Sequence, residues 1–180
     1  MLLPGSQKIN SHGRLEIGGC DTLELAETFG TPLYVLDEAL IRQRCREYVR
    51  EFQARWPKTF VLFAGKAFLS TALCRVVDQE GLGLDVSSLG ELYTALRADF
   101  PTDRLMVHGN NKSDEEVEAA LKCGAGHLVI DSLTEIEQVQ RCAQRLACTG
   151  RVLLRITPGI DTHTHDSIRT GQFDTKFGIP

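Results

Sequence analysis

Short apolar segments rich in β-branched residues alternate with helical patterns along almost the whole chain. Continuous apolar strands of this kind, separated by helices, predict a parallel sheet covered by helices. Six segments have this strand-like character, and each ends in small or polar residues: PLYVLDE (32–38), TFVLFAG (59–65), GLDVSS (83–88), RLMVHGN (104–110), HLVIDS (127–132) and RVLLRIT (151–157).

Helix starts are marked after three of these segments. A serine is followed three residues later by a glutamate at each of them, which is the spacing of a capping box: Ser88 with Glu91, Ser113 with Glu116, and Ser132 with Glu135. Apolar residues at helical spacing follow each serine. Gly124 and Gly150 are placed to end the second and third of these helices.

The repeating strand and helix units favour a β/α barrel over a doubly wound sheet. A doubly wound sheet usually has a glycine-rich loop at its first strand-to-helix turn, but LDEALIRQ (36–43) contains no glycine. Six strands are fewer than the eight that close a barrel. The fold class predicted is therefore a parallel β/α barrel of the TIM type that is incomplete in this chain.

Composition excludes several classes of function. A net charge of -4 gives no basic surface for a nucleic-acid backbone, and no stretch approaches the length of a membrane span. The six cysteines never form C-x-x-C pairs, so we interpret them as structural thiols in a reducing compartment. These features predict a cytoplasmic protein that acts on a small molecule or another protein, with no nucleic-acid or membrane partner.

Candidate functional residues stand where the apolar segments end, because barrels carry their chemistry at the carboxyl ends of the strands. They are Lys66, Asp85, His108, Asn110, Asp131 and Arg155. Any one of them could instead cap a helix or satisfy loop backbone, and we interpret Asp131 in this way because it directly precedes the Ser132 cap.

Lys66 is the most informative of these residues. Apolar neighbours on both sides are expected to desolvate its ammonium group and to lower its pKa, which would supply a free amine. Such a lysine is a candidate nucleophile that forms a Schiff base with an aldehyde. The alternative is that the side chain extends past the strand end into solvent.

A second cluster, DTHTHD, contains four residues that are competent metal ligands: Asp161, His163, His165 and Asp166. Pro158 and Gly159 just before it indicate a loop, in which alternate residues do not converge on one ion. We therefore predict no metal site, and we interpret His127 as an ordinary residue at the start of a strand.

Six segments follow one another in a specific order: PLYVLDEALI, FAGKAF, EGLGLDVSSLGELYTAL, HGNNKSDEEVEAAL, VIDSLTEIE and VLLRITPGIDTHTHDSIRTGQFDTKFGIP. Together they resemble the amino-terminal part of the diaminopimelate decarboxylases. The resemblance runs from about Gly13 to the last residue. The resemblance implies an alanine-racemase-like barrel that holds pyridoxal 5'-phosphate and is followed by a β-domain. Residues 1–30 would pack with that β-domain, and residues 31–180 would form the first part of the barrel. It also implies a homodimer with shared active sites.

The same resemblance implies roles for three residues. Lys66 matches the lysine that forms the Schiff base with the cofactor, while Asp85 and Arg155 match cofactor-binding residues. Many relatives read aromatic-A-V-K-A-N at this lysine, whereas Gly65 and Phe68 stand here.

The reaction implied is the decarboxylation of meso-2,6-diaminopimelate to L-lysine and carbon dioxide, the last step of lysine biosynthesis. Two alternatives remain open: a non-catalytic module that binds pyridoxal phosphate, and a related decarboxylase that acts on ornithine or arginine.

Overall fold

The computed structural model describes residues 5–159 and 177–180. The chain divides into two compact units, Met1–Thr59 and Phe60–Pro180. The resemblance predicts a different boundary, near residue 30, because residues 1–30 would pack with a further β-domain. That boundary stays a prediction.

The first unit contains a small antiparallel sheet and two helices. Its strands pair in the order β1-β2-β3, and they are β1 (Lys8–Ile9), β2 (Leu15–Ile17) and β3 (Cys20–Asp21). Asp21 then caps α1 (Thr22–Phe29) by accepting from the Leu23 and Glu24 N–H groups. Asp37 caps α2 (Glu38–Gln53) by accepting from the Leu40 N–H.

The segment PLYVLDE is not a strand in this structure, so that expectation is wrong. Residues 31–36 belong to no helix or strand, and Tyr34 is 94% exposed. A strand exists only through hydrogen bonds to a neighbouring strand, and among the described residues no backbone hydrogen bond joins residues 31–36 to another segment. The last two residues of the segment, Asp37 and Glu38, instead begin α2.

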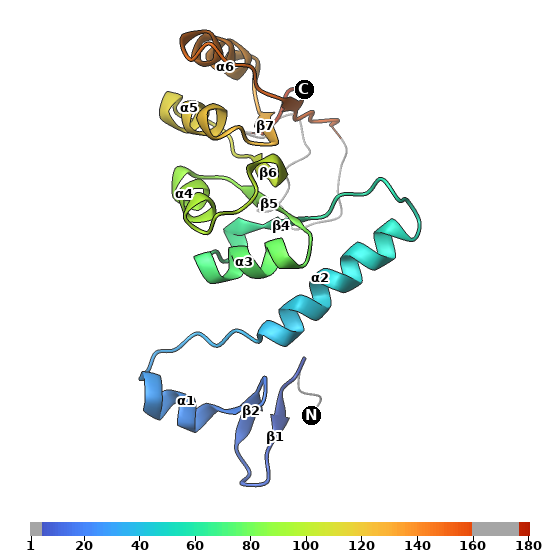
Figure 1. Ribbon diagram of the computed structural model, residues 1–180, viewed down its shortest axis with the longest axis vertical. Coiled ribbons are helices and arrows are strands. Elements are labelled where there is room, and N and C mark those ends of the chain that lie inside the picture. Colours follow the sequence, from blue (N-terminus) through green and yellow to red (C-terminus); the bar gives the residue numbers. More distant parts are fainter. Residues whose placement is uncertain (1–4, 160–176) are drawn as a thin grey trace. The chain divides into compact units, whose positions relative to one another are not determined.

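The second unit is a five-stranded parallel sheet whose strands pair in sequence order, β4-β5-β6-β7-β8. The strands are β4 (Leu62–Ala64), β5 (Gly83–Val86), β6 (Leu105–Val107), β7 (His127–Ile130) and β8 (Val152–Leu154). The helical segments between them are η1 (Gly65–Ala67), α3 (Thr71–Gln79), α4 (Leu89–Arg97), η2 (Thr102–Arg104), α5 (Asp114–Cys123) and α6 (Leu133–Arg145). Figure 1 shows α3 to α6 stacked along one side of this sheet. Five of the six predicted strands and the incomplete β/α barrel are thus confirmed.

The core lies between the sheet and these helices. Alternate strand residues Leu84, Val86, Leu105 and Val107 are each at most 4% exposed. Burying each of these side chains contributes about 1.5–3 kcal/mol to folding. Side chains alternate between the faces of a strand, so Asp85 and its register partner Met106 lie on the opposite face. Asp85 is therefore on the face of the sheet that α3 to α6 do not cover.

The serine caps form as predicted, although only one capping box is complete. Ser113 accepts from the Glu116 N–H, and the Glu116 carboxylate accepts from the Ser113 N–H at 2.8 Å. Ser88 and Ser132 accept from the third residue of their helices in the same way. The glutamates of those two helices reach one residue further back, because Glu91 accepts from the Ser87 N–H and Glu135 from the Asp131 N–H.

One of the two predicted helix ends is confirmed. Gly124 ends α5 in the left-handed conformation, with φ of 68°. Gly150 does not end α6, which stops at Arg145. Ala147 takes the left-handed conformation there, with φ of 50°, so the chain turns before it reaches the glycine.

Candidate active site

Five residues with polar or charged side chains gather at the carboxyl ends of the five parallel strands. Lys66 lies in η1, directly after β4, and Asp85 lies within β5. His108, Asp131 and Arg155 each follow the last residue of β6, β7 and β8. Because the strands are parallel and pair in sequence order, these ends meet along one edge of the sheet. Five of the six candidates predicted from the strand ends therefore lie along this edge, and the sixth, Asn110, lies in the loop two residues beyond His108.

Lys66 is exposed in this structure, so the expected desolvation of its ammonium group by neighbouring residues is not seen. It stands in a turn beyond β4, which is an edge strand of the sheet, and its apolar neighbour Phe68 is itself 45% exposed. The preceding Gly65 is buried against β5, where an added Cβ would lie 2.9 Å from the Asp85 carbonyl oxygen. The lysine turn is thus packed tightly on the strand that carries Asp85.

Asp85 carries a buried carboxylate oxygen, Oδ1, for which the described residues provide no hydrogen-bond partner. Burial raises the pKa of this carboxyl above its ordinary value of 3.8. The positive charges of His108 and Lys66 act in the opposite direction and lower it, while Glu91 raises it. Asp85 therefore has an unused acceptor within electrostatic reach of the Lys66 amine.

This burial predicts a pH-dependent cost to stability. A carboxyl whose pKa is raised in the folded state contributes stability below its unfolded pKa and loses it as the pH rises through the folded pKa. Asp85→Asn removes the charge, so the cofactor-free full-length variant is expected to be more stable than the parent at neutral pH. The two proteins should converge at acidic pH in denaturant unfolding followed across this range.

Asp103→Asn, which changes an exposed aspartate at the other end of the sheet, is the matched control and should leave the pH dependence as in the parent. A parent protein that is more stable than Asp85→Asn at neutral pH would contradict the prediction.

His108 interacts electrostatically with charged residues at the neighbouring strand ends. Burial lowers the pKa of its imidazole. Asp85 and Asp131 raise that pKa, and the positive charges of Arg155 and Lys112 lower it. The sequence placed His108 at a strand end but gave it no role. Its electrostatic interactions with charged residues in β5 and after β7 and β8 depend on the order of the strands. No local signal near residue 108 reveals that order.

Arg155 is held in place by Asp131 and by an aromatic ring. Its Nη1 donates to Asp131 Oδ1 at 2.9 Å, and its guanidinium carbon lies 4.4 Å from the centre of the Phe177 ring. Asp131 is 4% exposed, and its other oxygen accepts from the Gly178 N–H at 3.0 Å. Asp131 therefore satisfies loop backbone, as interpreted, and it also fixes the orientation of Arg155, which was not foreseen.

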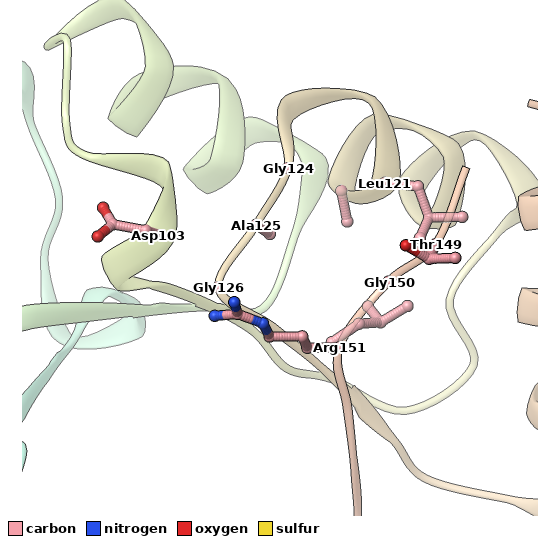
Figure 2. A pocket seen from close by; sticks show the side chains of 10 residues that line it. Asp103, Leu121, Gly124, Ala125, Gly126, Thr149, Gly150 and Arg151 are labelled. Carbon is pink, nitrogen blue, oxygen red and sulfur yellow. The ribbon is translucent and has the colours of Figure 1, made fainter. Parts of the chain in front are cut away.

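Figure 2 shows residues that line a cavity of about 380 Å³, and none of the five strand-end residues is among its lining. It is lined by residues that precede β7 and β8, including Gly126 and Arg151, and by Asp103 of η2. These positions are at the amino ends of the strands. Conserved chemistry in β/α barrels occurs at the carboxyl ends, so we assign the site to the edge that carries Lys66 and Asp85.

Other candidate sites receive no support from the described residues. Within residues 5–159 and 177–180, no three histidine, cysteine, aspartate or glutamate side chains are grouped to hold a metal ion. The DTHTHD cluster lies outside that part of the chain. All six cysteines are free thiols, and burial raises the pKa of Cys74 and Cys123, as expected of structural thiols. Across the part that the structure describes, no helix is both long and apolar enough to cross a bilayer.

A parallel β/α sheet with an accessible lysine and a buried carboxylate at its carboxyl edge fits the class of barrels that hold an aldehyde cofactor on a lysine. Comparison with known proteins gives the family. Residues 38–180 match the family described as "Pyridoxal-dependent decarboxylase, pyridoxal binding domain". The chain belongs to this family, and its expected cofactor, pyridoxal 5'-phosphate, is confirmed.

The chain is also similar to several diaminopimelate decarboxylases. The chain is 50% identical over 179 residues to that of Bacillus subtilis (strain 168) and 48% identical to that of Bacillus methanolicus, covering 99% of this chain each time. The crystal structure of the M. jannaschii diaminopimelate decarboxylase superimposes with a TM-score of 0.84 at 34% identity, over 97% of this chain and 41% of that one. The chain spans 41% of the length of the two Bacillus proteins.

The described residues fit pyridoxal phosphate chemically. Lys66 offers an exposed primary amine, which is the group that binds an aldehyde covalently. The unpartnered Asp85 oxygen supplies a negative charge next to that amine. Arg155 adds a cation whose direction is set by Asp131. These three residues are the ones that the resemblance assigned to the cofactor.

Proposed function

We propose that the protein containing this chain is a carboxy-lyase that converts meso-2,6-diaminopimelate to L-lysine and carbon dioxide with pyridoxal phosphate, in lysine biosynthesis. The observation that carries the proposal is identity of 45–50% to diaminopimelate decarboxylases along nearly the whole chain. The crystal structure of the M. jannaschii relative in complex with L-lysine, the proposed product, gives further support. The lysine/ornithine decarboxylase of Vibrio vulnificus is only 24% identical and shares the fold.

Within this function, Lys66 would hold the cofactor covalently through Nζ. Asp85 would hold the Lys66 nitrogen in position, because its buried carboxylate has an unused oxygen and lies within electrostatic reach of that amine. Arg155 would bind the cofactor from the opposite end of the strand series, since it follows β8 and Lys66 follows β4. The bound cofactor supplies an electron-poor ring that takes up the electron pair left when carbon dioxide departs.

The proposed assembly is a cytoplasmic homodimer that shares its active sites and binds an amino-acid substrate. Free, buried cysteines are in keeping with a reducing compartment. Residues 1–30 would pack with the β-domain of the complete enzyme.

The test uses the full-length protein loaded with pyridoxal phosphate and measures carbon dioxide and amine products from four substrates. We expect L-lysine from meso-diaminopimelate, with kcat/KM for ornithine and arginine lower by about 10²-fold or more, because those substrates lack the second carboxylate and leave its partners unpaired. The L,L isomer of diaminopimelate is the matched substrate control.

Two outcomes separate the alternatives. Faster turnover of ornithine or arginine would assign the protein to the related decarboxylases. Tight cofactor binding without decarboxylation of any of these substrates would identify a non-catalytic pyridoxal phosphate module.

A further inference from the structure

Lys112 and Glu135 form a buried ion pair beside the strand ends. Their charged atoms, Nζ and Oε1, lie 2.9 Å apart, and their side chains are only 3% and 5% exposed. The contact is ionic, since Oε1 has no well-aligned hydrogen-bond donor. Burying each charge costs several kcal/mol of desolvation, and the attraction within the pair offsets this cost only in good geometry, so such a pair contributes little net stability.

Each member of the pair also holds backbone next to a residue of the site. Lys112 Nζ donates to the Gly109 carbonyl at 2.5 Å, and Gly109 directly follows His108. Glu135 Oε2 accepts from the Asp131 N–H at 2.5 Å, and Asp131 orients Arg155. The ion pair therefore connects the end of β6 to the end of β7, two strands that pair directly.

We propose that the Lys112–Glu135 pair is a positioning element of the cofactor site, which fixes the ends of β6 and β7 against each other and thereby the placement of His108 and Arg155. The proposal rests on the proposed function only in that pyridoxal phosphate is the ligand. Both residues act through backbone and through other side chains, so neither is a catalytic residue.

Burial and geometry separate this role from simple stabilisation. A buried ion pair is a weak source of stability, and its replacement by uncharged residues of similar size is often neutral. The Lys112 carbonyl accepts a hydrogen bond from Gln138 Nε2 of α6 at 2.9 Å. The loop that follows His108 is therefore attached to α6 through both the backbone and the side chain of Lys112. An arrangement that only filled the core would not need these directed contacts to the two site loops.

The experiment compares the full-length protein with the double variant Lys112→Met/Glu135→Gln. The substitutions remove both charges and the donor to Gly109, and they keep an acceptor for the Asp131 N–H. We expect denaturant stability of the cofactor-free protein close to that of the parent. The affinity of the cofactor-free protein for pyridoxal phosphate, titrated by absorbance, should fall by about 10- to 100-fold, since small displacements of positioned groups have effects of this size.

The visible circular dichroism of the bound cofactor is a second readout, because it reports how the ring is oriented in the site. It should change in the double variant. Glu118→Gln is the matched control, since Glu118 of the neighbouring helix α5 pairs with Lys122 of the same helix and with Arg145 of α6, away from the strand ends. It should leave both the affinity and the dichroism as in the parent.

Unchanged affinity and dichroism in a folded double variant would overturn the proposal. If the double variant does not fold, Glu135→Asp decides, because it keeps the charge but shortens the side chain by one methylene group. A folded Glu135→Asp protein with parental cofactor affinity would likewise overturn it. These readouts need no substrate, so they stand even where the assignment to diaminopimelate fails.

Discussion

Replacing Lys66 with alanine is expected to abolish the covalent cofactor adduct that borohydride reduction traps in the full-length protein. Lys66 presents the exposed amine at the carboxyl edge of the sheet, next to the buried Asp85 carboxylate. The second lysine of that edge, Lys112, is buried in its ion pair with Glu135 and is not available to an aldehyde. Decarboxylation should fall at least by the roughly 10²- to 10⁴-fold that one positioned proton-transfer group supplies.

The measurement is borohydride reduction followed by peptide mapping, together with kcat and the absorbance of the bound cofactor. Lys122→Ala is the matched control, because Lys122 is a surface lysine paired with Glu118 on α5. It should keep the adduct and the activity. Recovery of the reduced cofactor on Lys112 or Lys176 in the parent protein would show that the site has been placed on the wrong residue.

Residues 1–180 expressed alone are expected to self-associate and to form no lysine from diaminopimelate. Among the described residues, the strand β8 pairs only with β7, and its residues Val152, Leu153 and Leu154 are 42–53% exposed. Exposing a few hundred Å² of apolar surface costs several kcal/mol at about 25 cal/mol per Å². This cost is comparable with the net stability of roughly 5–15 kcal/mol that a whole domain has, and an open strand edge also invites pairing with another copy.

Sedimentation, a thermal transition and lysine formation with added pyridoxal phosphate test this expectation, with the full-length protein as the control. A monodisperse monomer with a sharp transition would show that the exposed strand costs less than estimated. Lysine formed faster than with free cofactor would show that these residues contain more of the catalytic apparatus than their placement indicates.

Local signals in the sequence were enough to predict most of the second unit. The apolar segments that became β4 to β8 are bounded by polar residues, and the serine caps depend on groups only three residues apart, so both are visible without knowing the fold. The same reasoning failed for PLYVLDE, because strand formation needs a partner from elsewhere in the chain. It also failed for Gly150, because Ala147 turned the chain earlier.

The candidate site, too, could be predicted only in part from the sequence. Lys66, Asp85 and Arg155 could be selected from the sequence because each stands where an apolar segment ends. The exposure of Lys66 could not, since it depends on β4 being an edge strand. The links from Asp131 to Arg155 and from Lys112 to Glu135 join residues 24 and 23 positions apart across neighbouring strands, and only the strand order brings them together.

Gly65 limits which residues the lysine turn can accept, because it packs against the backbone of Asp85 in β5. Its φ is not in the left-handed region, so backbone conformation alone would allow other residues there. The space does not, because a Cβ would lie 2.9 Å from the Asp85 carbonyl oxygen and 3.4 Å from Leu69. A side chain such as valine can enter this position only if the turn moves away from β5. A larger residue at position 65 is therefore expected to be tolerated only together with a compensating change in the turn or in the strand that carries Asp85.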